Sequence, residues 1–238
     1  MIVLYRIYQL LIMAPLLLVA TVLVTTSTII GCALGGGRFW GYWPEVLWGK
    51  IFCWLSFVKV TISGKENIDK KTSYVFVANH QGAYDIFSIY GYLGHEFRWM
   101  MKASLSRIPM VGFACVMSKQ VYVDKSSPTA LRTTMSRAQN LLSDGMSIVV
   151  FPEGARSSNG KMRPFKRGAF MLAQEFNLPV VPITIDGAFD VLPRFKKIPN
   201  WGHIHITIHK PIEPGPDGHD MIKLIEDSHR IIENSLKK

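Results

Sequence analysis

An uncharged apolar stretch near the start of the chain constrains the fold more than any other feature. Between Arg6 and Arg38, residues 7–37 contain no charged side chain. A helix needs about 20 apolar residues to cross the hydrocarbon core of a membrane, and this stretch is long enough. Pro15 is tolerated in a membrane helix, and hydroxyl side chains over residues 25–28 can bond back to the backbone. The sequence therefore predicts an N-terminal membrane helix.

Aromatic side chains dominate the segment that follows. Residues 39–54 contain five of them with amphipathic rings: Trp40, Tyr42, Trp43, Trp48 and Trp54. Such a composition is typical of the boundary between membrane and water. We predict an interfacial or re-entrant helix over residues 44–58, so that residues 1–57 form a membrane-anchoring unit.

Three other interpretations of the N-terminus are open. A cleaved secretory signal has a basic start and an apolar region of about 7 to 15 residues, whereas this stretch is longer and has only Arg6 before it. The run Ile29-Ile30-Gly31-Cys32 resembles a bacterial lipoprotein cleavage box. A buried core helix would need a larger protein around it.

Residues 58–238 predict one α/β domain, a mixed and mostly parallel sheet flanked by helices. Short apolar runs alternate with helical patterns, which indicates strands joined by crossover helices. Strands are predicted at 58–63, 74–78, 98–101, 120–123, 147–151, 180–185 and 203–209. Helices are predicted after Asp85 and at 128–143, 167–176 and 221–236.

Charge and cysteine content narrow the classes of partner. With 27 Lys and Arg against 17 Asp and Glu, the net charge is +10, which favours an anionic partner such as a lipid surface, a phosphorylated substrate or nucleic acid. No recognisable nucleic-acid motif is present, so we expect no nucleic-acid partner. The three cysteines are widely and irregularly spaced, which indicates neither a disulfide framework nor a zinc site and fits a reducing compartment.

A histidine and an aspartate follow the predicted strand at 74–78. His80 lies in the loop at the end of that strand, where open α/β sheets form their ligand crevice, and Asp85 comes five residues later. A loop that runs into a helix can fold the Asp85 carboxylate back to the imidazole. Asp85 would then fix the tautomer of His80, whose other ring nitrogen could accept a proton from a substrate hydroxyl. Alternatively, Asp85 is only a helix N-cap.

A second strand-end loop is glycine-rich and basic. The strand at 147–151 ends in Pro152-Glu153-Gly154-Ala155-Arg156, and Arg156, Lys161, Lys166 and Arg167 lie within twelve positions. Glycine lets a backbone approach an anion closely, and Arg and Lys are the side chains that bind phosphate. The loop is either a phosphate site or a solvated basic loop.

Together these residues resemble the glycerolipid acyltransferase family typified by 1-acylglycerol-3-phosphate acyltransferases. The resemblance covers residues 58–185 in four ordered blocks. They are His80 with Asp85, the run 121–125 ending in Lys125, the run 151–156, and Val180-Val181-Pro182-Ile183. The family commonly has Arg at position 125, Ser at position 82 and Thr at position 155, where this chain has Lys, Gly and Ala.

The resemblance implies a glycerol-3-phosphate acyltransferase-like fold and a role for each matched residue. His80 is implied to be the general base and Asp85 its orienting partner. Glu153, Gly154 and Arg156 are implied to help bind a phosphorylated acceptor, together with Lys125 and Lys102. From their position in the basic loop, Lys161 and Lys166 are predicted to join them. No metal site is predicted.

The implied reaction is acyl transfer to the sn-2 hydroxyl of 1-acylglycerol-3-phosphate (lysophosphatidate), which yields phosphatidate in phospholipid biosynthesis. We expect no cofactor: the acyl thioester of coenzyme A or of acyl carrier protein would be a co-substrate, and no covalent acyl-enzyme is implied. Membrane lipids are the expected surroundings. Because acyl thioesters are made in the cytoplasm, we place the catalytic domain at the cytoplasmic face of the cell membrane.

The sequence also allows two alternative functions and one possible metal site. The chain could acylate a different lyso-lipid, such as a lyso-aminolipid, or could bind anionic lipid without catalysis. In the strand at 203–209, His203, His205 and His209 share one face, which could bind a metal, although such strands usually place Ile on the core face and polar residues in water.

Overall fold

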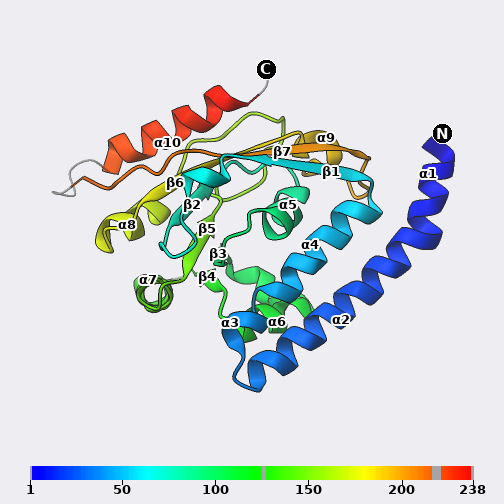
Figure 1. Ribbon diagram of the computed structural model, residues 1–238, viewed down its shortest axis with the longest axis horizontal. Helices are drawn as coiled ribbons and strands as arrows, with labels where there is room; N and C mark the ends of the chain where they lie inside the picture. The colour runs from blue at the N-terminus through cyan, green and yellow to red at the C-terminus, as the bar shows by residue number, and fades with distance from the viewer. Residues whose placement is uncertain (1, 125–126, 216–220, 237–238) are drawn as a thin grey trace.

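The domain is built on one seven-stranded sheet. The computed structural model describes residues 2–124, 127–215 and 221–236. The strands are β1 (Val58–Ser63), β2 (Val75–Ala78), β3 (Phe97–Lys102), β4 (Val121–Val123), β5 (Ser147–Val150), β6 (Val180–Asp186) and β7 (Gly202–Ile208). Their order across the sheet is β1-β7-β6-β2-β5-β3-β4 (Figure 1). All seven lie where the sequence predicts them, within a residue or two.

The strand directions determine which loops lie at the same edge of the sheet. Strands β6, β2, β5, β3 and β4 pair in parallel, so their carboxyl ends meet at one edge. β7 is antiparallel to β6, and β1 is parallel to β7. The predicted mixed, mostly parallel sheet is therefore confirmed. The carboxyl edge of β2 and its neighbours is where an open α/β sheet binds its ligand.

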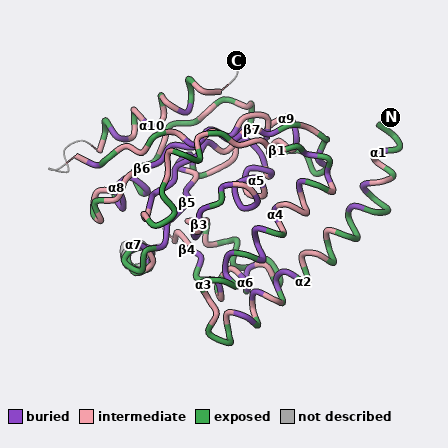
Figure 2. Tube along the Cα trace, viewed as in Figure 1, coloured by how far each residue is buried: buried purple, intermediate pink, exposed green. Residues whose placement is uncertain are grey.

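Helices cover both faces of the sheet. The helices of the domain are α5 (Tyr84–Tyr92), α6 (Val111–Met117), α7 (Pro128–Ser143), α8 (Gly168–Glu175), α9 (Ala188–Val191) and α10 (Met221–Ser235), with 3-10 turns at Lys65–Asn67 and Ala103–Arg107. Strand β2 shows why two cores form, because Phe76 and Ala78 face the core under α5 and α9, whereas Val75 and Val77 face the core under α7, α8 and α10. Both cores lie along the sheet in Figure 2. Helices α6 and α9 and the 3-10 turns were not predicted from the sequence.

A long apolar helix lies along one side of the domain. It consists of α1 (Ile2–Tyr8), a π-helical turn (Gln9–Met13) and α2 (Ala14–Ala33), and a short α3 (Gly37–Trp40) leads to α4 (Trp43–Leu55) (Figure 1). Residues 2–33 are long and apolar enough to cross a membrane, and most of the helix is not buried by the rest of the protein. The predicted long apolar N-terminal helix is confirmed, and its length and composition are those of a membrane-associated helix.

Polar contacts hold this helix on the domain and on α4. Tyr5 Oη donates to the Ser56 carbonyl oxygen (2.8 Å), and Trp48 Nε1 donates to Thr21 Oγ1 (2.9 Å). Helix α4 packs on α5 through one face, where Cys53 is fully buried, whereas Trp54 is exposed. The predicted boundary at residue 57 falls in the turn between α4 and β1.

Candidate active site

His80 and Asp85 lie in contact at the carboxyl end of β2. His80 Nδ1 is 2.7 Å from Asp85 Oδ2, and the same oxygen accepts the backbone N–H groups of Gln81 (2.7 Å) and Gly82 (2.9 Å). Asp85 is in the first turn of α5 and is completely buried. The carboxylate therefore binds the imidazole, whereas the alternative that Asp85 is only a helix N-cap is wrong. Asp85 is the second residue of α5, the N-cap is Ala83, and Oδ2 accepts N–H groups that precede the helix.

The contact with Asp85 determines which ring nitrogen of His80 is available. A buried carboxylate only accepts hydrogen bonds, so Nδ1 carries the proton and Nε2 is left with a lone pair. The imidazole ring stacks on Phe151, with 3.9 Å between centroids and 6° between planes, and 13% of the His80 side chain is exposed. A rigid imidazole with an accessible lone pair is the arrangement that general-base catalysis requires.

The buried side chain of Glu153 connects the loop after β2 to the loop after β5. Its Oε1 accepts the His80 N–H (2.7 Å) and its Oε2 accepts the Arg163 N–H (2.9 Å), while the Ser157 N–H donates to the His80 carbonyl oxygen (2.8 Å). Burial raises the pKa of Glu153 above its usual value, although the two backbone N–H groups oppose the shift. Both oxygens are thus occupied by backbone, and an acceptor-binding role for Glu153 stays a prediction.

Cations surround this carboxyl edge without carboxylate partners. Lys102 ends β3, and Arg156, Lys161 and Lys166 lie in the loop after β5. None of the four forms an ion pair in the described part of the chain. A Cβ on Gly154, whose φ is +75°, would lie 2.5 Å from Lys166 Nζ, so Lys166 crosses over this glycine. Cations that have no ion-pair partner among the described residues can bind an anionic substrate at such an edge.

One predicted residue cannot be placed. Lys125 follows β4, whose carboxyl end is at the same edge of the sheet as those of β2, β3 and β5, but it lies outside the described residues.

Several residues that build the site were not predicted from the sequence. The fully buried Asn79 joins β2 to β6 by two hydrogen bonds, both at 2.8 Å. Its Nδ2 donates to the Ile185 carbonyl oxygen, and its Oδ1 accepts the Ile185 N–H. Gln81 Nε2 donates to the Gly160 carbonyl oxygen at 3.0 Å. Their place beside His80, at the end of a buried strand, was the available signal. Phe151 was part of the matched run, but nothing in the sequence indicated that its ring stacks on His80.

The segment after α9 packs against the His80 loop and was also missed. Gly82 forms an isolated antiparallel bridge with Pro193, and the Ala83 N–H donates to the Leu192 carbonyl oxygen (3.2 Å). A Cβ at position 82 would overlap the Ala188 carbonyl oxygen and lie 2.9 Å from that of Leu192. The glycine that stands where the family commonly has serine is therefore required by the close approach of this segment.

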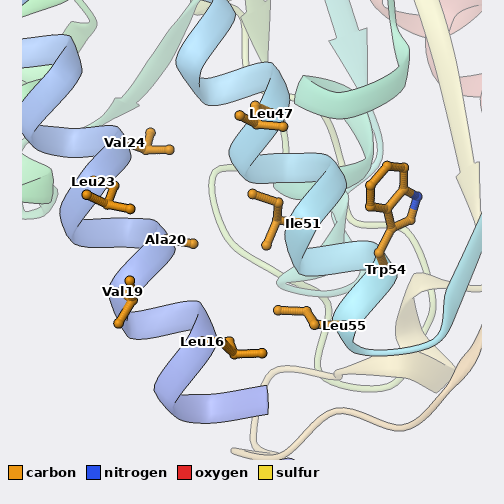
Figure 3. A pocket seen from close by; sticks show the side chains of 9 residues that line it. All are labelled: Leu16, Val19, Ala20, Leu23, Val24, Leu47, Ile51, Trp54 and Leu55. Atoms are coloured by element: carbon orange, nitrogen blue, oxygen red, sulfur yellow. The ribbon is translucent and has the colours of Figure 1, made fainter. Parts of the chain in front are cut away.

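Two cavities lie apart from the His80 loop. A groove of about 370 Å³ between α2 and α4 has an apolar lining: Leu16, Val19, Ala20, Leu23, Val24, Leu47, Ile51, Trp54 and Leu55 (Figure 3). A second hollow of about 420 Å³ lies by α6, β4 and α7, and its lining includes Lys119, Gln120 and Arg137. Neither is lined by His80 or Asp85, so the candidate base lies at the surface between loops and outside both cavities.

The histidines in and directly after β7 lie within hydrogen-bond distance of hydroxyl groups. Thr61 Oγ1 lies 2.8 Å from His203 Nε2 and 2.7 Å from His205 Nδ1, and His209 Nε2 lies 2.8 Å from Thr184 Oγ1. The Ile residues of this strand are fully buried. Among the described residues, no group of three or more His, Cys, Asp and Glu could hold a metal ion.

Comparison with known proteins decides the family. A family model described as Acyltransferase matches residues 59–186, which is more than half of the chain and includes both strand-end loops. The chain belongs to the acyltransferase family. Its match includes the His80–Asp85 pair and the run from Phe151 to Arg156.

Similar proteins cover the domain and, in one case, almost the whole chain. Over 168 residues this acyltransferase is 36% identical to the chloroplastic 1-acyl-sn-glycerol-3-phosphate acyltransferase BAT2 of Brassica napus, which covers 70% of this chain and 48% of the relative. It is 30% identical over 156 residues to the alpha form of Homo sapiens, which covers 65% of this chain and 55% of the relative. The chain thus spans about half the length of the curated relatives it matches.

A solved structure extends the similarity to the N-terminal helices. The crystal structure of the 1-acyl-sn-glycerophosphate (LPA) acyltransferase PlsC from Thermotoga maritima superposes with a TM-score of 0.76 and 26% identity. The match covers 97% of this chain and 95% of that chain. Both the domain and the apolar helix therefore belong to a shared architecture.

Proposed function

We propose that this protein is a 1-acylglycerol-3-phosphate O-acyltransferase. It transfers a fatty acyl group from an acyl thioester to the sn-2 hydroxyl of lysophosphatidate and so makes phosphatidate for phospholipid biosynthesis. The observation that carries the proposal is the His80–Asp85 contact at 2.7 Å, at a sheet edge whose cations have no ion-pair partner among the described residues. The names of the similar proteins agree with this acceptor.

The proposed mechanism uses His80 as the base. Nε2 accepts the proton of the sn-2 hydroxyl as its oxygen attacks the thioester carbonyl carbon, and Asp85 stabilises the imidazolium that forms. The new ester C–O bond forms as the C–S bond breaks, and the imidazolium returns the proton to the leaving thiolate. The acyl donor in this mechanism is a thioester, either acyl-CoA or acyl carrier protein thioester. The transfer is direct, so it uses no covalent acyl-enzyme, no free fatty acid and no cofactor.

The acceptor and the membrane helix suit each other. Lysophosphatidate lies in a bilayer with its phosphate at the surface, where Arg156, Lys102, Lys161 and Lys166 can bind it as the substrate anion. Glu153 acts indirectly in this proposal, since it holds the His80 backbone and the Arg163 backbone together. We place the domain on the cytoplasmic face of the cell membrane, where thioester donors are made.

The acceptor can be tested by comparing two lyso-lipids. Purified protein in detergent is given a labelled acyl thioester with lysophosphatidate or with a phosphate-free lyso-aminolipid. A charge-assisted hydrogen bond is worth about 1.5–3 kcal/mol, so we expect Arg156→Ala to lower kcat/KM for lysophosphatidate by at least about tenfold. Lys70→Ala, at an exposed lysine in the turn before β2, is the matched control.

Three outcomes would count against the acceptor. If parent protein acylates only the lyso-aminolipid, the acceptor is wrong while the reaction class holds. Equal loss with both acceptors would remove the phosphate role of Arg156. If neither lipid is acylated with either donor, the chain is not this enzyme, and membrane-tethered binding of anionic lipid becomes the better account.

A further inference from the structure

The connection between α9 and β7 combines cations with exposed apolar side chains. Residues 194–201, which we call the α9–β7 loop, read Arg-Phe-Lys-Lys-Ile-Pro-Asn-Trp. Phe195 is 75% exposed, Ile198 55% and Trp201 47%, and Arg194, Lys196 and Lys197 are exposed between them. The loop itself has no acidic residue. Large apolar groups in water are unfavourable, so this surface is suited to a partner.

The loop is attached directly to the start of the apolar helix. Arg6 donates from Nη1 to the Pro199 carbonyl oxygen and from Nη2 to Asn200 Oδ1, both at 2.8 Å, and Gln9 Nε2 donates to the Pro199 carbonyl oxygen at 2.8 Å. The ring of Tyr5 packs edge-on against Trp201, with 4.8 Å between centroids. In Figure 1 the α9–β7 connection lies on the side of the molecule that carries α1.

The other end of the loop borders the His80 site. Pro193 bridges Gly82, Leu192 accepts the Ala83 N–H, and Arg194 Nη1 lies 3.4 Å from the Arg156 carbonyl oxygen. Eight residues therefore connect the membrane helix to both strand-end loops.

We infer that the α9–β7 loop is a second membrane-contact element, which binds the surface of an anionic bilayer. The aromatic and aliphatic side chains Phe195 and Ile198 would enter the interface, and the lysines beside them would meet lipid phosphates. Continuity with a helix that is itself apolar and mostly unburied favours lipid over an acidic protein as the occupant. This inference goes beyond acyl transfer, because it concerns how the protein contacts its bilayer.

Depth in the bilayer tests the inference without relying on catalysis. An environment-sensitive fluorophore is attached at Phe195→Cys in the full chain after Cys32, Cys53 and Cys115 are replaced by alanine, and the protein is reconstituted in phosphatidylcholine vesicles with 30% phosphatidylglycerol. The matched control carries the label at Ile222→Cys, an exposed apolar position on α10. We expect doxyl-labelled lipid to quench the label at 195 several-fold more than at 222. Equal quenching at both positions would overturn the inference.

A second measurement needs no cysteine replacement. Hydrogen exchange of the parent protein is compared in nanodiscs of the same lipid and of phosphatidylcholine alone. We expect amides of residues 195–198 to exchange several-fold more slowly with anionic lipid, and Lys196→Gln with Lys197→Gln to remove this difference, whereas Lys70→Gln with Lys71→Gln retains it. Protection that is independent of lipid charge, or that requires acyl carrier protein, would contradict the assignment to anionic lipid.

The lipid measurements and the acyltransfer assay fail separately. If the loop contacts the bilayer but no acyl transfer occurs, only the proposed function is lost. If acyl transfer occurs while the label at position 195 remains in water, only the second membrane contact is lost.

Discussion

At the scale of single residues, the site depends on one carboxylate oxygen with three partners. Asp85 Oδ2 accepts from His80 Nδ1 and from the backbone N–H groups of Gln81 and Gly82. The other oxygen, Oδ1, is buried and has no hydrogen-bond partner among the described residues. The loop from residue 80 to residue 85 is thus closed around Oδ2, and the orientation of the imidazole is coupled to the first turn of α5.

Asp85→Asn should therefore impair catalysis far more than folding. With its oxygen in the place of Oδ2, the amide accepts the same three donors but lacks the charge that stabilises an imidazolium. In the flipped orientation its NH2 group faces Nδ1 and stabilises the wrong tautomer of His80. We expect kcat to fall by about 10²- to 10⁴-fold, with a far-ultraviolet circular dichroism spectrum like that of the parent. A loss of less than about threefold in acyl transfer would show that Asp85 does not orient the base.

Glu153→Gln should change the pH dependence of stability. Burial raises the folded-state pKa of Glu153, so its contribution to stability is fully present below the unfolded-state pKa and is lost as pH rises through the folded-state value. Gln does not titrate, so it makes no pH-dependent contribution. Because its NH2 group cannot accept, Gln loses one of the two hydrogen bonds to backbone N–H groups at every pH. We expect the parent's advantage in Tm over the variant to be largest near about pH 4 and to shrink towards about pH 8.

Thermal unfolding in detergent across that pH range makes the comparison. Glu175→Gln, at an exposed glutamate that ends α8, is the matched control for the loss of one carboxylate. An advantage that instead grows with pH would mean that the two N–H groups outweigh burial at Glu153.

Sequence could identify the chemical groups of the site but not all of their partners. His80, Asp85 and the cations after β5 were predictable, because they lie in loops that follow apolar strands. The contacts of Glu153 were not, since its two N–H donors belong to residues 73 and 10 positions away. Only the folded chain shows that this carboxylate faces backbone.

At the scale of elements, strand patterns were most predictive for the central strands, which are buried. In β2 and β5 every residue is buried, and such apolar runs between turn residues are recognisable from the sequence. Helix α6 was missed because it has only seven residues and no charged side chain within them to mark a polar face. Helix α9 has only four residues, which is too few to show apolar residues repeating at helical spacing.

The packing of the α9 segment on the His80 loop gives a prediction at Gly82. A Cβ there would overlap the Ala188 carbonyl oxygen, and the Gly82 N–H must still reach Asp85 Oδ2. We expect Gly82→Ala to cost about 1–3 kcal/mol of unfolding free energy, as overpacking does, which corresponds to about 2–4 °C in Tm for each kcal/mol. Acyl transfer should fall as well, because the loop shifts.

The control for this prediction is another glycine. Gly37→Ala places its Cβ where no atom lies within 4 Å, so we expect its Tm and activity to stay near those of the parent. Equal behaviour of the two variants would contradict the close packing inferred at Gly82.

At the scale of the whole molecule, the membrane helix and the domain form one unit. The sequence predicted an apolar helix followed by an aromatic segment, but not that Tyr42 and Cys53 would be buried in the core of the α/β domain. Such packing depends on shape complementarity with α5, which cannot be predicted from the hydropathy of the sequence. The structure therefore places the apolar helix, the α9–β7 loop and the carboxyl edge of the sheet in one connected arrangement.

His80 is the proposed base of an acyl transfer to lysophosphatidate. The most direct test is phosphatidate formation from a labelled acyl thioester by purified protein, compared with His80→Ala and with His203→Ala, at an exposed histidine of β7. We predict that the parent and His203→Ala make phosphatidate at similar rates, whereas folded His80→Ala makes about 10²-fold less or none. Equal rates in all three proteins, or no product from the folded parent with either thioester donor, would contradict the account.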